Sequence, residues 1–327
     1  MTALPLPARD RLRSYTGDLR QFATVRKIVL DDGPETGLRA MAFSTGGGLD
    51  FWVLSDRSLD IGPLWWRGTP VAWQHPCGYL TPALYHPNGD QGTGIERALS
   101  GFMVSCGAEH MRQPANGHPL HGNLPLTPAR VTGYGENWDA AEPYLFCEGE
   151  TTVSHLSRTS YRLNRRIEAP VGGTTFRVLD RIENIGLQPQ DLAMLYHINF
   201  GFPAVGQGTS VEIDDTEVLA VGLPDEGATN LQPRFACHAV SGPDTARTVL
   251  KRRGSGQWPG FQAAVTTQAG RLPYVQIWAD PRPGRNIVAI EPATSDRRDD
   301  GTSQSGDFLH PGEIWTSRLE FEFSSPD

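Results

Sequence analysis

Apolar and polar residues alternate regularly near the end of the chain. Across residues 318–323 an aliphatic or aromatic side chain stands at every second position, between charged ones. This period of two predicts a strand with one buried face. The same alternation runs through residues 176–183, and residues 49–54 form an apolar run between three glycines and a polar turn. We therefore predict strands in all three segments.

Further short apolar runs follow one another along the chain, separated by turn segments rich in glycine and proline. Three such turns are residues 169–173, 222–225 and 281–284. No strand pattern alternates with long amphipathic helices, so a doubly wound parallel sheet is disfavoured. The pattern favours a mainly β fold, a large antiparallel sandwich or barrel with few short helices. The polar stretch 295–306 is predicted to be a loop and not a domain boundary, because a strand pattern follows it.

One helical pattern stands near the start of the chain. Its apolar positions have the spacing of one helix face: Leu12, Tyr15, Leu19 and Phe22. Gly17 interrupts the pattern, so any helix is predicted to be short. We expect one domain over residues 1–327, with residues 1–25 as a short helical N-terminal extension.

Composition and charge exclude several classes of protein. The 36 glycines and 26 prolines among 327 residues disfavour a helix bundle. The formal net charge of −8 offers no basic surface for nucleic acid, and no apolar run is long enough to span a membrane. The four cysteines lie far apart without a Cys-x-x-Cys pair, and the N-terminus lacks the pattern of a secretory signal. We expect a soluble, cytoplasmic protein, a monomer or a homodimer, without nucleic-acid or membrane partners.

A first group of candidate functional residues lies in the segment 117–123, where His121 follows a glycine- and proline-rich approach. Glycine lets a ligand come close to the backbone, and an imidazole can exchange protons near neutral pH. A metal site is the alternative, formed by His110, His118 and His121 with Glu109 as an oxygen ligand. The order of these residues matches no known metal motif, so no metal is predicted.

A second group lies in the apolar segment 192–202. His197 and Asn199 are two residues apart, so on a strand they share one face. Two polar side chains on an apolar strand need partners, because leaving each one buried and unpaired costs about 1–3 kcal/mol. They are either a hydrogen-bonded pair in the core or the polar lining of a cleft.

Three more segments carry candidate residues. Glu291 ends an apolar run before Pro292 and is either a paired structural charge or a general base with a raised pKa. In the segment 273–278, Gln276 and Trp278 are predicted to contact a substrate, Trp278 because aromatic faces pack well against sugars. Arg57 is a candidate ligand clamp, with an ion pair to Asp56 or Asp60 as the alternative.

Taken together, these segments resemble the galactose mutarotase (aldose 1-epimerase) superfamily, in particular a poorly characterised bacterial branch. The resemblance rests on motifs that follow one another in order: Asp56–Ile61, Leu120–Gly122, Leu195–Asn199, Glu291–Pro292 and Phe308–Glu313. It covers about residues 37–323. The resemblance implies a β-supersandwich of large antiparallel sheets, with a small-molecule carbohydrate bound in an open cleft and no cofactor.

The resemblance also implies a function, the interconversion of the α and β anomers of a free sugar or an acidic sugar derivative. Glu291 would take the proton of the anomeric hydroxyl, His197 would protonate the ring oxygen and His121 would hold that oxygen. Arg57 and Asn199 would bind the substrate with Gln276 and Trp278, and we expect both histidines to face one cleft with Arg57.

Some positions depart from the family pattern or stay open. Asn123 stands where this branch often has arginine. The aspartate that binds sugar hydroxyls has no match, which leaves the segment 235–238 as the candidate for its place. The sugar-binding arginine is Arg97, Arg112 or Arg57. The alternative functions are a non-catalytic carbohydrate-binding or regulatory protein, or another sugar isomerase or lyase on the same fold.

Overall fold

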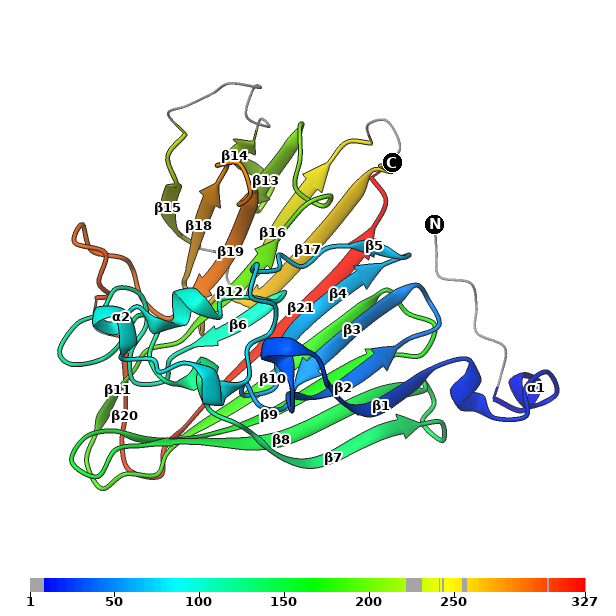
Figure 1. Ribbon diagram of the computed structural model, residues 1–327, viewed down its shortest axis with the longest axis horizontal. Helices are drawn as coiled ribbons and strands as arrows, with labels where there is room; N and C mark the ends of the chain where they lie inside the picture. The colour runs from blue at the N-terminus through cyan, green and yellow to red at the C-terminus, as the bar shows by residue number, and fades with distance from the viewer. Residues whose placement is uncertain are drawn as a thin grey trace.

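The computed structural model describes residues 9–221, 231–240, 242, 244–254, 258–304 and 306–326. Two large sheets pack face to face in these residues: sheet I, with ten strands, and sheet II, with nine (Figure 1). Neighbouring strands are antiparallel in both sheets. The mainly β fold with few short helices, predicted from the sequence, is therefore confirmed.

Both sheets combine strands from distant parts of the chain. In spatial order, sheet I consists of β1 (Thr24–Val29), β2 (Arg39–Ser44), β3 (Leu49–Leu54), β4 (Asp60–Trp66), β6 (Met103–Cys106), β12 (Leu195–Phe200), β19 (Ile287–Ala293), β18 (Tyr274–Asp280) and β15 (Arg234–Ala239), with β5 (Thr69–Pro70) paired to β4. In the same manner, sheet II consists of β14 (Thr216–Val221), β13 (Thr209–Ile213), β16 (Thr245–Arg252), β17 (Phe261–Gln268), β21 (Ile314–Ser324), β10 (Thr175–Asn184), β9 (Ser160–Pro170), β8 (Tyr144–Ser154) and β7 (Arg130–Asn137).

The remaining elements are short. A separate two-stranded sheet consists of β11 (Gln190–Leu192) and β20 (Asp307–Leu309). The helical segments are α1 (Arg9–Arg13), α2 (Gly89–Gly92), and the 3-10 turns η1 (Leu19–Gln21), η2 (Gly33–Glu35), η3 (Pro82–Leu84), η4 (Gly94–Arg97) and η5 (Leu124–Leu126). In Figure 1, α2 and the loops around it lie beside β6 and β12.

The alternating patterns of the sequence correspond to strands with one buried face. In β21, buried and exposed residues alternate over nearly the whole strand, and β10 shows the same alternation. The predicted apolar run 49–54 is β3. β12 and β19 differ, because all of their residues are buried. These two strands therefore lie under a covering layer on one side and against sheet II on the other.

The predicted N-terminal helix face does not form. α1 ends at Arg13 and only η1 follows it, and Tyr15 is 71% exposed. Gly17 lies between the two helical segments, where its backbone freedom opposes a continuous helix. Residues 1–8 of the predicted extension and the predicted turn 222–225 lie outside the described residues.

Aromatic side chains fill the space between the two sheets. Phe176 of β10 stacks on Phe51 of β3 with ring centroids 4.8 Å apart, and on Phe321 of β21 at 4.4 Å. Phe102 contacts Phe176 and Phe200 edge to face. Such pairs add about 0.5–1.5 kcal/mol each beyond the burial of apolar area. They fix the distance between β12 and sheet II.

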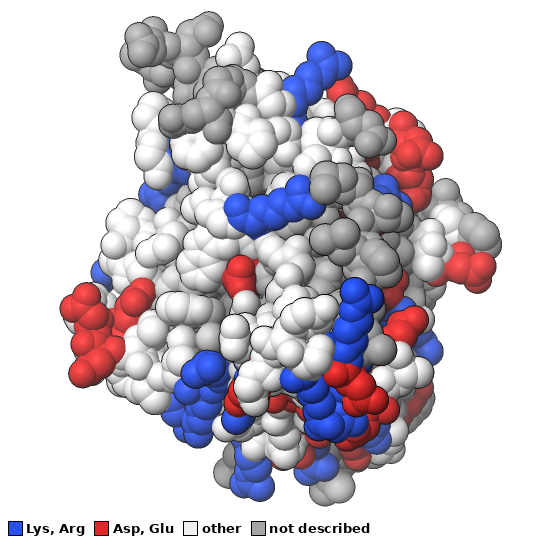
Figure 2. Space-filling view, turned by 90° about the vertical axis from the view of Figure 1, so that its right-hand side faces the viewer, with Lys and Arg blue, Asp and Glu red and all other residues white. Residues whose placement is uncertain are grey.

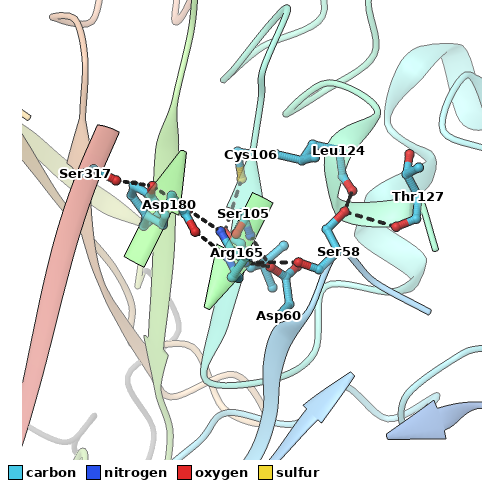
Figure 3. Close-up of polar contacts among 11 residues, drawn as sticks. Ser58, Asp60, Ser105, Cys106, Leu124, Thr127, Arg165, Asp180 and Ser317 are labelled. Atoms are coloured by element: carbon cyan, nitrogen blue, oxygen red, sulfur yellow. Dashed lines mark hydrogen bonds and ion pairs between the residues drawn. The ribbon is translucent and has the colours of Figure 1, made fainter. Parts of the chain in front are cut away.

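A buried ionic network also joins the sheets (Figure 3). Arg165 of β9 donates two hydrogen bonds to the carboxylate of Asp180, at 2.8 and 2.7 Å, and one to Asp60 Oδ1 of β4 at 3.1 Å. The Arg165 and Asp180 side chains are at most 1% exposed. Burial raises the pKa of Asp60 to about 6, although Arg165 acts in the opposite direction. Each carboxylate therefore depends on this one guanidinium for much of its stabilisation.

The network also reaches the strand β12. The hydroxyl of Tyr196 donates to Asp180 Oδ2 at 2.7 Å and lies 2.7 Å from the hydroxyl of Ser317. Tyr196 and His197 are neighbours on β12, so their side chains point to opposite faces of sheet I. The contact of Tyr196 with sheet II thus fixes the position of the strand that carries His197.

The molecular surface is mixed in charge. On the face shown in Figure 2, Lys and Arg side chains are interspersed with Asp and Glu. Among the described residues, no helix has the length and apolar character needed to cross a membrane.

Candidate active site

Two adjacent strands in the middle of sheet I bring the central polar residues together. β12 and β19 are antiparallel, with Leu195 opposite Ala293 and Ile198 opposite Ile290. This register places His197 and Glu291 across from each other, although 94 residues separate them in the sequence. The Nε2 atom of His197 lies 3.4 Å from Oε1 of Glu291.

Asn199 fixes the orientation and the tautomer of His197. Its side-chain amide donates to the carbonyl of Gly101 at 3.1 Å, so its oxygen is the atom that faces His197 Nδ1 at 2.5 Å. A carbonyl oxygen only accepts, and Nδ1 must therefore carry a hydrogen. The contact between Nε2 and Glu291 is favourable when the pair holds one further proton, on either the imidazole or the carboxyl.

Glu291 is a buried carboxyl with its second oxygen held in place. Its side chain is 1% exposed, and Oε2 accepts a hydrogen bond from the amide of Gln276 at 2.5 Å. Burial raises the pKa of Glu291, while His197, Arg112 and Gln276 oppose the shift. The side-chain oxygen of Gln276 is buried without a hydrogen-bond partner among the described residues. This oxygen is available to accept a hydrogen bond from a ligand.

His121 faces His197 from a loop above the strands. The two imidazole centroids are 5.4 Å apart, edge to face. The backbone N–H of Arg112 donates to His121 Nδ1 at 3.3 Å, and the N–H of His121 donates to the carbonyl of Arg112 at 2.9 Å. Because Nδ1 accepts, the hydrogen of a neutral His121 is on Nε2. Burial and the neighbouring His197 hold the pKa of His121 well below its usual value, so His121 is a neutral hydrogen-bond donor.

The two hydrogen bonds between Arg112 and His121 form a backbone clamp, and both residues of this clamp have an unusual conformation. Arg112 has φ of 68° and His121 has φ of 64°, a left-handed conformation that side chains other than glycine seldom adopt. The guanidinium of Arg112 is fixed by the carbonyls of Ser295 and Asp296, at 2.9 and 2.8 Å, and by the hydroxyl of Ser303 at 3.2 Å. Arg112 thus connects His121 to the loop that follows β19.

Aromatic and polar residues on β18 and β15 extend the site across sheet I. Gln276 and Trp278 of β18 lie on the same face of sheet I as Glu291 of β19, and Trp278 lies edge to face with His197 at 5.9 Å. On β15, Cys237 lies opposite Gln276 and Phe235 opposite Trp278. The segment 235–238 therefore lies beside Gln276 and Trp278.

The other two arginines considered from the sequence lie elsewhere. Arg97 is exposed and forms an ion pair with Asp90. Arg57 is fully buried, and the one hydrogen bond of its guanidinium among the described residues goes to the carbonyl of Ser100 at 3.2 Å. Neither Asp56 nor Asp60 forms an ion pair with it, because they pair with Arg39 and Arg165. The structure brings His121 and His197 together but, within its described part, shows no contact of Arg57 with either imidazole.

The histidines of the metal alternative do not converge on one point. His110 and His118 stack on each other with ring centroids 5.5 Å apart, whereas His121 faces His197. One oxygen of Glu109 accepts two hydrogen bonds from Asn123, at 3.0 and 2.8 Å. Within the described residues, no group of three or more His, Cys, Asp or Glu could hold a metal ion.

Sequence reasoning missed two features of the site. The first is the clamp between Arg112 and His121, because neither position is a glycine that would indicate a positive φ. The second is Arg297, whose guanidinium carbon lies 3.9 Å from the centroid of the Phe235 ring. In the sequence, Arg297 is one charge in a polar loop and gives no signal of this contact.

A pair that holds one mobile proton, next to a neutral donor, can move protons between two oxygen atoms that share a carbon. One member accepts a proton while the other donates one, and the same proton count is restored at the end.

The fold in which this site lies is that of the galactose mutarotase-like proteins. A protein from Klebsiella pneumoniae subsp. pneumoniae MGH 78578, described as a "putative aldose 1-epimerase", superposes with a TM-score of 0.79 at 18% identity, over 96% of this chain and 85% of that one.

Two further solved structures show the same fold. A galactose mutarotase-like protein from Clostridium acetobutylicum superposes with a TM-score of 0.57 at 12% identity, over 92% of this chain and 98% of that chain. A galactose 1-epimerase from Lactobacillus acidophilus NCFM gives 0.54 at 9% identity, over 93% and 99%. The resemblance found in the motifs is confirmed at the level of the fold.

The chain belongs to the family described as a domain of unknown function, DUF4432, whose model matches residues 35–323. No curated protein matches the sequence significantly.

Proposed function

We propose that the protein is a mutarotase, an isomerase that interconverts the α and β anomers of an aldose by opening and closing its ring. The observation that carries the proposal is the pair of Glu291 Oε1 and His197 Nε2 at 3.4 Å, with the other nitrogen of His197 occupied by Asn199. The anomeric hydroxyl and the ring oxygen are bonded to the same carbon, so an acid and a base that serve both must themselves be close together.

The proposed reaction conserves atoms and charge at each step. Glu291 takes the proton of the anomeric hydroxyl, the C1–O5 bond breaks as the C1 aldehyde forms, and His197 Nε2 gives its proton to O5. The Nε2–H of His121 donates a hydrogen bond to O5 and stabilises the developing negative charge on this oxygen. The aldehyde then rotates about the C1–C2 bond, and the ring closes on either face with the two proton transfers reversed.

The proton count of the pair is the same before and after ring opening. The reaction begins with ionised Glu291 and protonated His197 and leaves neutral His197 beside protonated Glu291. The open-chain sugar therefore meets the groups in the states that ring closure requires. Among the chain's own residues, Gln276 and Asn199 keep the pair in position throughout.

Polarimetry or NMR exchange spectroscopy with freshly dissolved pure anomers tests the proposal. The panel contains neutral aldoses, uronates and aldose phosphates, each compared with the spontaneous rate in the same buffer. We expect acceleration of at least one sugar in proportion to protein concentration. Binding of a sugar without acceleration of any in the panel would instead support a non-catalytic carbohydrate-binding protein.

We predict a bell-shaped dependence of kcat/KM on pH. On the acid side the pair gains a second proton and Glu291 can no longer accept one, and on the alkaline side the pair loses its last proton. Because burial raises the pKa of Glu291, activity should begin to fall at a pH above the usual range of a glutamate as the solution is acidified. Measured rates after subtraction of the spontaneous reaction check this. A flat profile down to pH 4 would contradict the assignment of Glu291.

A further inference from the structure

Arg297 stands at the edge of the site, in the loop after β19. Its guanidinium lies over the Phe235 ring, and its hydrogen bond goes to the carbonyl of Arg298 at 3.3 Å. The neighbouring carboxylate of Asp296 accepts the backbone N–H of Arg297 at 2.7 Å. Within the described part of the chain, no carboxylate lies within ion-pair distance of the Arg297 guanidinium.

The strand order gives the distance of this cation from the catalytic pair. Phe235 lies opposite Trp278, and Trp278 lies opposite Ala289, which shares a face of β19 with Glu291. β15 is two strands from β19, which corresponds to about 10 Å across the sheet. A sugar with its anomeric carbon at Glu291 and its ring against Trp278 would therefore extend its far substituents toward Arg297.

A second cation adds to the positive field. Arg112 is buried, and its guanidinium donates hydrogen bonds to two carbonyls, a hydroxyl and the sulfur of Cys237. Its Nε–H has no partner among the described residues. The charges of both Arg112 and Arg297 act on Glu291 and oppose the rise of its pKa. Two arginine cations thus act on the region around Glu291.

We propose that Arg297, held on the face of Phe235, binds an anionic substituent on a carbon of the sugar remote from the anomeric carbon. The substrates would then be acidic aldoses, in which the anion is a carboxylate or a phosphate. Both groups accept two hydrogen bonds from a planar guanidinium. Stacking on an aromatic ring leaves available those N–H groups of Arg297 that do not bond to the Arg298 carbonyl. The inference rests on the proposed function and identifies the substrate class of the same site.

The test compares Arg297→Gln with Arg298→Gln on matched sugars. Glucose, glucuronate and glucose 6-phosphate share a ring and differ in the substituent at C6, so the two charged sugars distinguish a carboxylate from a phosphate. Loss of a charged hydrogen bond corresponds to about a 10–100-fold effect. We expect Arg297→Gln to lower kcat/KM by about this factor for the anionic sugar, mainly through KM, and to lower it much less for glucose, which has no anion to lose its partner. Arg298 is an exposed neighbour, and its variant should behave like the parent with every sugar.

A binding measurement separates failure of this inference from failure of the proposed function. The probes are the 1,5-anhydro forms of glucose and glucose 6-phosphate, which lack the anomeric hydroxyl and cannot open, titrated by calorimetry. The charged probe should bind more tightly than the neutral one, and Arg297→Gln should remove the difference. Equal binding of both probes, or unchanged binding in the variant, would overturn the inference even if a neutral sugar is anomerised. Arg297-dependent binding without acceleration of any sugar would support the anion site and overturn the mutarotase function.

Discussion

Replacing Glu291 with glutamine is expected to lower the rate of anomerisation by about 10²–10⁴-fold, the usual contribution of one positioned base. The substitution keeps the length of the side chain and its capacity to accept the hydrogen bond from Gln276, now 2.5 Å from the carboxylate. It removes the basic oxygen that lies 3.4 Å from His197. Folding should persist, because the neutral amide fits a buried site at least as well as a charge does.

NMR exchange rates of the parent and the variant, with circular dichroism to verify the fold, check this prediction. His197→Asn should reduce the rate by a similar factor. The double variant should lose less than the product of the two single effects, because both residues act in one proton-coupled step. If Glu291→Gln anomerised every sugar as fast as the parent does, the base would be another residue.

The largest expected effect on stability comes from Arg165→Met. Removal of one partner of a buried ion pair typically costs about 3–5 kcal/mol, because the charge left behind remains out of water. Here two carboxylates, Asp180 and Asp60, would lose the guanidinium that both contact. Urea denaturation followed by circular dichroism measures the free energy of unfolding. The loss of stability should be smaller at pH 5 than at pH 8. Burial already raises the pKa of Asp60 to about 6 in the parent, so at pH 5 this carboxyl is mostly protonated and no longer leaves an unpaired charge in the variant.

The adjacent residue on the same strand gives a matched control. Arg166 also pairs with two carboxylates, those of Glu148 and Glu168, but its side chain is 29% exposed. Ion pairs in contact with water contribute about 0–1 kcal/mol, so Arg166→Met should destabilise the protein only slightly. Equal losses in the two variants would refute the special importance of the buried network.

The period-two alternation of apolar and polar residues was sufficient to predict many of the strands from the sequence. Residues 318–323 alternate because β21 packs one face on the core and exposes the other. The N-terminal helix was poorly predicted, since the spacing of Leu12 and Tyr15 carried no information on whether any surface would cover Tyr15. Spacing by two also placed His197 and Asn199 on one face, which the structure shows.

The partners of the site residues could not be derived in the same way. Asn199 was predicted to bind substrate, whereas in the structure both ends of its amide are used, one by His197 and one by Gly101. That His197 meets Glu291 follows from the register of β12 and β19, which depends on tertiary contacts that one sequence does not reveal. The contact of Arg297 with Phe235 depends on the same kind of pairing, between β15 and β18.

The pairing of β12 with β19 has a consequence for biosynthesis. The two strands are neighbours in sheet I, but the second reaches the ribosome exit about ninety residues after the first. Chains are made from the N-terminus, and contacts between distant segments form late because a long loop must close first. A nascent chain halted before β19 would leave the backbone N–H and C=O groups on one edge of β12 unpaired and hold a histidine without its carboxylate. The proposed activity would therefore report the completion of folding, and β12 is the segment that a chaperone would need to shield until then.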